Sequence, residues 1–242
     1  MNKEEFISEC VSAFEFNSLP CDVAHAEALF LLTERMIEVN KSLNLTAIKD
    51  EKAIILKHYV DSVTVSAYIP HESNVIDVGC GAGFPTLPLA IFRPDLKIVA
   101  LDGTAKRINY VSETSKMLGL SNVNAVAARA EEMAQNADFR EKFDVVTARA
   151  VAALPVLCEL CIPFTRLGGK MIAMKSQRAQ DELLEAKNCI EICGGRIADV
   201  ISCDIRSNDG ACEERNLIFI DKIKKTPLLY PRHFSKISKK PL

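Results

Sequence analysis

The chain has no tryptophan and only four tyrosines among its 242 residues. Stacking of bases on aromatic side chains, which many nucleic-acid-binding proteins use, would therefore be limited to one or two positions. No apolar run approaches the roughly 20 residues that span a bilayer. Residues 1–5 are polar and acidic, with no apolar segment behind them, unlike a secretory signal. We therefore expect a cytoplasmic protein without membrane association.

Motifs of several enzyme classes are also absent. No Gly-x-Ser-x-Gly occurs, which argues against an α/β-hydrolase, and no His-Glu-x-x-His, which argues against a zinc protease of that type. Cysteine is abundant instead, with nine residues. Cys158 and Cys161 form a Cys-x-x-Cys, and Cys189 and Cys193 lie one helical turn apart. A zinc or redox site is the weaker reading, because no histidine is near and no zinc-like loop joins the pairs; apolar neighbours favour buried thiols.

The net charge of −2 conceals an asymmetry. Residues 222–242 contain seven lysines or arginines and no acid, which leaves 23 basic and 32 acidic residues in the rest of the chain. A basic end on an acidic body is typical of a protein with a polyanionic partner. An inert solvated tail fits the charge equally well. The Lys, Pro and Ser composition from Lys222 onward predicts an extended or mobile arm.

The first part of the chain, residues 1–65, reads as a helical extension. Apolar residues follow a 3.6-residue period after Asp22, whose side chain could cap the helix at its start. The periodic positions are Ala24, Leu29, Leu32, Met36 and Val39. A further helix is predicted at about Glu51–Ile69.

From residue 66 to residue 221 the pattern changes to short β-rich runs that alternate with helical stretches. The runs are Asn74–Val78, Lys97–Leu101, Val123–Ala127, Phe143–Ala148 and Lys170–Met174, with helices such as Ala105–Leu118 and Gln180–Ile192 between them. This alternation predicts an α/β domain with a parallel sheet covered by helices on both faces. Two final strands, about Arg196–Cys203 and Arg215–Ile220, should add an antiparallel hairpin around the polar loop 207–210 (Ser-Asn-Asp-Gly), which makes a seven-stranded, mostly parallel sheet.

A glycine-rich loop follows the first of these strands, with Gly79, Gly81 and Gly83 in a G-x-G-x-G pattern. In open α/β sheets such loops lie at the carboxyl ends of the strands, where ligands bind. The dinucleotide fingerprint would need a glycine at Phe84. Asp77, two residues before the first glycine, suits a cationic ammonium group better than an anionic pyrophosphate. The pattern therefore favours S-adenosylmethionine over a dinucleotide.

Acids follow the next two strands. Asp102 ends the second strand and could accept hydrogen bonds from ribose hydroxyls, and Ala130 and Glu131 come where the adenine edge would lie. Taken singly, Asp102 and Glu131 could be helix first-turn acids; in this order behind the glycine loop, the cofactor interpretation is favoured. After the fourth strand the chain has Thr147–Ala150 rather than the Asn-Pro-Pro-Tyr or Asp-Pro-Pro-Tyr of amino-group methylases.

Together these motifs identify a resemblance that covers almost the whole chain. The chain resembles the bacterial small-subunit ribosomal RNA guanine-N7 methyltransferase G family, also called the glucose-inhibited division protein B family. The matching segments are Asn44–Thr46, His58, Asp61-Ser62, Asp77–Pro85, Leu101-Asp102, Lys106-Arg107, Arg129–Glu131, Thr147–Ala150, Ala173–Lys175, Lys224–Pro227 and Tyr230–Arg232. One departure is Gly103, where the family often has serine.

The resemblance implies a Rossmann-like methyltransferase fold and an S-adenosylmethionine site. Its cofactor-binding residues would be Asp77, Gly79, Gly81, Gly83, Phe84, Asp102, Ala130, Glu131 and Arg149. We expect Arg149 to be catalytic through contact with the cofactor or the phosphate of the target nucleotide. The roles of His58 and Lys175 stay open.

The resemblance further implies methylation of N7 of a guanine in 16S ribosomal RNA, within the small subunit or an assembly intermediate, by a monomer. Lys106, Arg107, Arg129 and the basic tail are candidate phosphate contacts. Two alternatives remain: a methyltransferase that acts on a small molecule or another RNA, and a ribosome-associated RNA-binding module without catalysis. No metal is expected.

Overall fold

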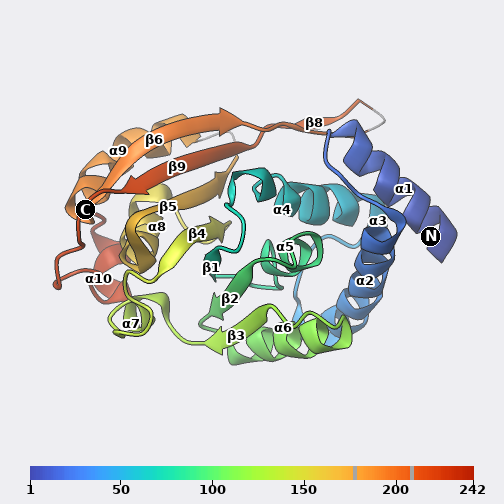
Figure 1. The fold of residues 1–242 in the computed structure, drawn as a ribbon, viewed down its shortest axis with the longest axis horizontal. Helices are drawn as coiled ribbons and strands as arrows, with labels where there is room; N and C mark the ends of the chain where they lie inside the picture. Colours follow the sequence, from blue (N-terminus) through green and yellow to red (C-terminus); the bar gives the residue numbers. More distant parts are fainter. Residues whose placement is uncertain (177–178, 208–209) are drawn as a thin grey trace.

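A seven-stranded sheet runs through the middle of the protein (Figure 1). The computed structural model describes residues 1–176, 179–207 and 210–242. In spatial order the strands are β3 (Val123–Ala127), β2 (Lys97–Asp102), β1 (Asn74–Val78), β4 (Phe143–Arg149), β5 (Thr165–Lys175), β9 (Asn216–Lys222) and β6 (Gly195–Ser202). The first five run parallel, and β9 is antiparallel to both of its neighbours. The seven-stranded, mostly parallel sheet is thus confirmed.

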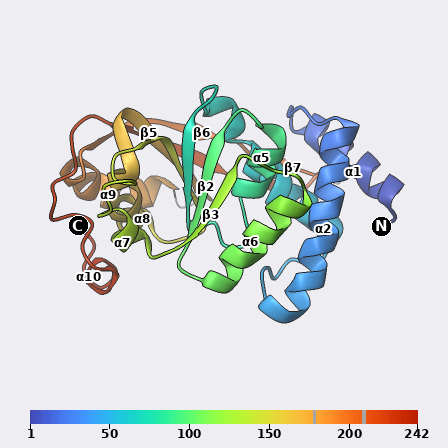
Figure 2. The ribbon, with the colours of Figure 1, turned by 60° about the horizontal axis from the view of Figure 1, so that its bottom comes forward.

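Helices lie on both faces of this sheet, and short helical turns connect them (Figures 1 and 2). They are α1 (Lys3–Phe16), α2 (Val23–Leu43), α3 (Glu51–Ile54), the π-helix η1 (Ile55–Val60), α4 (Asp61–Val63), the 3₁₀ turn η2 (Ser66–Tyr68), α5 (Thr86–Phe92), α6 (Ala105–Met117), α7 (Ala130–Met133), α8 (Leu154–Cys161), the 3₁₀ turn η3 (Ile162–Phe164), α9 (Ala179–Ile192) and α10 (Phe234–Lys239). No helix among the described residues is long and apolar enough to cross a membrane.

Strand alternation explains the two layers of core. In β1, Ile76 and Val78 belong to the cluster built with α8 and α9, whereas Val75 belongs to a cluster that includes Leu89 and Ala90 of α5. Neighbouring side chains of a strand point to opposite faces, so the central strands are buried on both sides. This explains why they read as continuous apolar runs in the sequence.

The N-terminal helices pack beside the sheet. As expected, Asp22 caps α2, and its carboxylate accepts a hydrogen bond from the amide of His25 at 2.8 Å. The predicted helix 51–69 forms as α3, η1, α4 and η2, with a π-helical interior that a 3.6-residue period does not reveal. The buried hydroxyls of Tyr59 in η1 and Thr33 in α2 lie 2.6 Å apart, which ties this segment to α2.

The end of the chain departs from the expectation of an extended or mobile arm. Lys222 is the last residue of β9 and is buried. The residues after it stay at the same end of the molecule and lead to α10, which packs on α8 (Figure 1). Composition indicated mobility because lysine and proline are common in loops, but it carries no information about tertiary partners.

Between β6 and β9 the expected hairpin includes a second small pair, β7 (Ile205–Arg206) and β8 (Cys212–Glu213). The predicted antiparallel strands are confirmed by the pairing of β6 with β9. Of the expected polar loop, Asn208 and Asp209 lie outside the described residues.

Candidate functional site

The glycine loop after β1 turns back against the end of β2. The amides of Gly79 and Cys80 both donate to the carbonyl of Leu101, at 2.7 and 3.1 Å. Gly79 has φ +76°, and a Cβ on it would lie 2.5 Å from Cγ2 of Val151. The loop therefore needs glycine here both for its backbone conformation and for the close approach of the segment after β4.

Asp102 closes the loop from the second strand. Its carboxylate accepts hydrogen bonds from the amide of Gly81 at 3.1 Å and from the amide of Thr104 at 2.7 Å. These bonds fix the side chain beside the loop, with only 8% of the residue exposed. The predicted proximity of the glycine loop and the second-strand acid is therefore present in the structure.

A cavity of about 250 Å³ lies at the carboxyl ends of the parallel strands. It is lined by Gly79, Asp102, Ala130 and Glu131 from the predicted set, together with residues that follow β2, β3 and β4. Glu131 is in the first turn of α7 and is nearly buried. Two carboxylates beside a glycine loop can accept hydrogen bonds from the hydroxyl and amino groups of a nucleoside.

Asp77 does not line this cavity but lies beneath the loop. Its carboxylate accepts hydrogen bonds from Thr86 Oγ1 at 2.7 Å and from Thr147 Oγ1 at 3.2 Å. Burial raises the pKa of Asp77 to about 6, against the lowering effect of these bonds and of Arg149. Gly81 and Gly83 also lie off the cavity lining, in the turn that shapes the loop. The roles of these three residues in cofactor binding stay predictions.

Phe84 and Arg149 form a second cluster next to the loop. The Phe84 ring stacks on His58, with centroids 4.4 Å apart, and the Arg149 guanidinium lies 5.4 Å from the Phe84 centroid. Arg149 Nη1 donates to the Lys57 carbonyl at 3.0 Å and to Asp61 Oδ2 at 2.7 Å. Arg149 is thus held at the end of β4 by the π-helix and the first residue of α4.

His58 is neutral in this environment. Burial and the nearby Arg149 charge lower its pKa to about 4, and its Nε2 lies 2.9 Å from Thr46 Oγ1. Lys175 is engaged elsewhere: its ammonium donates to the Ala152 carbonyl and pairs with Glu182, each at 2.6 Å. Sequence reasoning left both roles open; the structure brings His58 to the Phe84 cluster and Lys175 to the segment after β4.

The cysteine pairs support the interpretation as buried thiols. Cys158, Cys161, Cys189 and Cys193 are all buried and free. Burial raises the pKa of Cys158 and Cys161, which disfavours the thiolates that metals and electrophiles require. Among the described residues no group of histidines, cysteines and acids is arranged to hold a metal ion.

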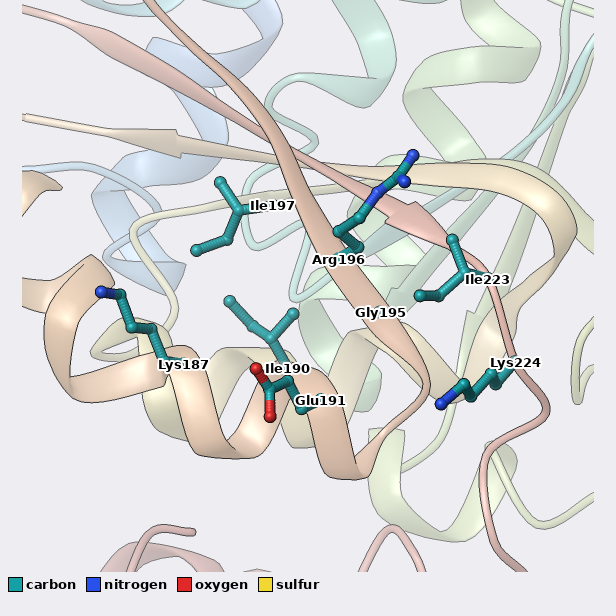
Figure 3. A pocket seen from close by; sticks show the side chains of 8 residues that line it. All are labelled: Lys187, Ile190, Glu191, Gly195, Arg196, Ile197, Ile223 and Lys224. Carbon is teal, nitrogen blue, oxygen red and sulfur yellow. The ribbon is translucent and has the colours of Figure 1, made fainter.

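A larger hollow, of about 570 Å³, lies between α9 and β6 (Figure 3). Lys187 and Glu191 of α9 face it from one side and Arg196 of β6 from the other. Gly195, in its wall, starts β6, which runs parallel to β5. The hollow is therefore at the amino ends of the strands, opposite to the edge where open α/β sheets bind ligands.

The cavity-wall residues that sequence reasoning missed include Val151 and Phe234. Val151 follows Arg149 by two residues, so its position after β4 was the available signal. Phe234 is more than a hundred residues from the nearest glycine of the loop, and nothing local in the sequence marks it.

Comparisons with known proteins agree with this geometry. The family model GidB, described as rRNA small subunit methyltransferase G, matches residues 25–218. Ribosomal RNA small subunit methyltransferase G of Lactobacillus delbrueckii subsp. bulgaricus is 42% identical over the full length of both chains. The protein of the same name from Acetivibrio thermocellus is 41% identical, over 98% of this chain and 96% of its own.

A solved structure shows the fold alone. M. jannaschii TYW2 in complex with AdoMet matches with a TM-score of 0.53 and 18% identity, over 68% of this chain and 76% of that one. The fold, the cavity at the carboxyl ends of the strands and the full-length relatives lead to one conclusion: the chain belongs to the rRNA small subunit methyltransferase G family of S-adenosylmethionine-dependent methyltransferases.

Proposed function

We propose that this protein transfers the methyl group of S-adenosylmethionine to N7 of a guanine in 16S ribosomal RNA. The observation that carries the proposal is the cavity where the glycine loop, Asp102 and Ala130-Glu131 meet, in a chain whose full-length relatives are named for small-subunit rRNA methylation. We further propose that the protein acts as a cytoplasmic monomer on the small subunit or an assembly intermediate.

The residues around the cavity fit the cofactor by chemistry. Asp102 would accept hydrogen bonds from the ribose hydroxyls, and Ala130 and Glu131 would face the adenine. The loop Gly79–Gly83 and Phe84 would hold the methionine end, with Arg149 beside it and Asp77 stabilising the loop from below. When bound, S-adenosylmethionine supplies an electrophilic methyl group on a cationic sulfur.

Guanine N7 is an acceptor whose chemistry suits this cavity. Guanine N7 has a free lone pair and needs no general base before it attacks a methyl group. Among the described residues, the side chains of the cavity wall that could accept a proton are Asp102 and Glu131, and this proposal assigns both to the cofactor. The protein's contribution would be to align nucleophile, methyl carbon and sulfur and to exclude water, which can lower a barrier by about 7–11 kcal/mol.

The test is methyl transfer from radiolabelled S-adenosylmethionine to small ribosomal subunits from a strain that lacks this gene, with wild-type subunits as the control. We expect label only in the deficient subunits, at a guanine that becomes sensitive to N7-specific cleavage. Label at another atom of the RNA would overturn the N7 assignment. Cofactor binding without label in any RNA would move the function to a small-molecule acceptor.

A further inference from the structure

The C-terminal segment reaches the cofactor cavity. Phe234, the first residue of α10, is one of the residues that line it, although it follows the last strand of the sheet by twelve positions. The guanidinium carbon of Arg129 lies 4.8 Å from the centroid of its ring. Because Arg129 directly precedes Ala130, the ring stands on the side of the cavity where the adenine is expected.

Gly103 makes room for this arrangement. A Cβ on Gly103 would lie 3.1 Å from Cδ and 3.2 Å from Nη1 of Arg129, closer than a comfortable van der Waals contact. The absence of a side chain at the position after Asp102 thus leaves room for the Arg129 side chain, which lines the cavity and lies over the Phe234 ring. Three separate segments, after β2, after β3 and at α10, build one wall.

The segment that carries Phe234 is fixed to the same framework as the rest of the cavity. Arg232, two residues earlier, donates to the fully buried Glu159 of α8 through its backbone amide at 2.9 Å, Nε at 2.8 Å and Nη2 at 2.6 Å. Gln135, two residues after the end of α7, donates to the carbonyl of Pro231 at 3.1 Å. Helices α7 and α8 both contribute to the cavity wall, so Phe234 is positioned relative to it.

The guanidinium of Arg140 binds the backbone of the turn that precedes Arg232 in the C-terminal segment. It donates to the carbonyls of Thr226 at 2.9 Å, Pro227 at 3.1 Å and Tyr230 at 2.9 Å. A loop with this many side-chain bonds to its backbone is ordered by the protein body. Folding has therefore already fixed the position of Phe234, and ligand binding need not supply the conformational entropy cost of ordering it.

We propose that Phe234 is a cofactor-contact residue, whose ring packs against the adenine of S-adenosylmethionine and makes the C-terminal segment part of the cofactor site. This rests on the proposed function only in taking S-adenosylmethionine as the ligand. An aromatic contact with a base contributes about 1–3 kcal/mol, which corresponds to a roughly 5- to 150-fold change in affinity. An aliphatic residue would supply area without the flat polarisable face.

The experiment measures binding of S-adenosylmethionine and of 5′-methylthioadenosine, which carries only the nucleoside half, to the full-length protein by calorimetry. Phe234→Ala should weaken both ligands by a similar factor of about ten or more, and Phe234→Tyr should restore binding. In methyl transfer, Phe234→Ala should raise KM for S-adenosylmethionine and leave KM for the RNA unchanged. Leu229→Ala is the matched control, because Leu229 is an exposed apolar side chain of the same segment (71% exposed).

The outcomes separate this proposal from the proposed function. If the wild type binds both ligands and Phe234→Ala binds them equally well, the contact does not exist. If Phe234→Ala and Phe234→Tyr weaken binding to the same extent and both unfold earlier than Leu229→Ala, the ring has only a structural role, which also overturns the proposal. A wild type that binds the cofactor but methylates no RNA refutes the proposed function and leaves the binding test intact.

Discussion

Gly79 combines two constraints that can be separated by experiment. Its φ of +76° disfavours any side chain, and a Cβ would collide with Val151, which lines the cavity. We expect Gly79→Ala to lower the free energy of unfolding by about 1–2 kcal/mol through backbone strain. It should also weaken S-adenosylmethionine binding, because Val151 must move. Calorimetry and chemical denaturation would measure the two effects.

Gly119 offers the matched control. Its φ is +69°, but no atom lies within 4 Å of the Cβ that alanine would add. Gly119→Ala should therefore lose similar stability and keep wild-type affinity for the cofactor. Equal affinities for the two variants would show that the close approach at Gly79 has no bearing on the cavity.

Asp77 should make stability depend on pH in an unusual direction. Burial raises its pKa from 3.8 to about 6, so the folded protein favours the protonated carboxyl. The stabilisation of the folded state that results is fully present below about pH 4 and is lost as the pH rises through 6. Its magnitude is about 3 kcal/mol. Asp77→Asn cannot ionise, so its free energy of unfolding relative to wild type should rise by about that amount between pH 4 and pH 7.

Comparison of variant with wild type is needed because His58 acts in the opposite sense. Its pKa is lowered from 6.5 to about 4, so its stabilising contribution grows as the pH rises over the same window. The two trends oppose each other in the wild type. Urea denaturation at a series of pH values, with the exposed Asp138→Asn as control, would isolate Asp77; a difference that stays constant with pH would contradict the raised pKa.

Between elements, Arg149 links the end of β4 to the π-helix. Its guanidinium bonds to Asp61 and to the Lys57 carbonyl and lies beside Phe84. We expect Arg149→Ala to reduce methyl transfer at least about 100-fold while the fold survives, as for the loss of a positioned electrostatic contact. Steady-state kinetics and circular dichroism would measure activity and folding.

Arg215 provides the matched comparison for that variant. It approaches the other oxygen of Asp61, with Nε 3.3 Å from Oδ1, but it has no contact with Phe84 among the aromatic contacts of the described residues. Arg215→Ala removes an equivalent charge from Asp61 and should keep most of the activity. If both variants lose activity equally, Arg149 acts through the Asp61 network and not through the cofactor or target nucleotide.

The elements that could be predicted are those specified locally. Short β-rich apolar runs located the strands, a 3.6-residue period located α2, and the glycine spacing located the loop. The partners of Arg149 could not be predicted, because Asp61 is 88 positions away and the π-helix that presents the Lys57 carbonyl leaves no periodic signal. Asp77 was expected beside the ligand because the sequence shows an acidic residue just before the glycine loop. Its burial, with hydrogen bonds from Thr86 and Thr147, depends on tertiary packing and could not be predicted.

At the scale of the whole molecule, the end of the chain contributes to the same cavity as the ends of the parallel strands. The sheet brings the ends of β1, β2, β3 and β4 to one cavity, and the C-terminal segment reaches the same cavity through Phe234. The seven cations of that segment therefore divide into two groups. Lys222 pairs with Glu141 and Arg232 with Glu159, each pair with one fully buried partner, and the remaining lysines are exposed.

The exposed lysines of α10 and its end, Lys236, Lys239 and Lys240, follow Phe234 by two to six residues, on the helix whose first residue lines the cavity. None of them has an ion-pair partner among the described residues. Charges so placed can contact RNA phosphates while the target base enters the site. Replacing all three with glutamine should weaken RNA binding and reduce the slope of log Kd against log salt by about 2, since each lost phosphate contact accounts for about 0.7.

Cofactor affinity should not change in this triple variant, because the substitutions leave Phe234 and the Arg232–Glu159 pair in place. A control triple variant replaces Lys97, Lys142 and Lys187, which are exposed lysines near the amino ends of the strands. It removes the same net charge from the far edge of the sheet, so nonspecific attraction falls equally in both proteins. Equal salt slopes for the two variants would mean that the RNA responds to the overall charge and not to the segment beside the cavity.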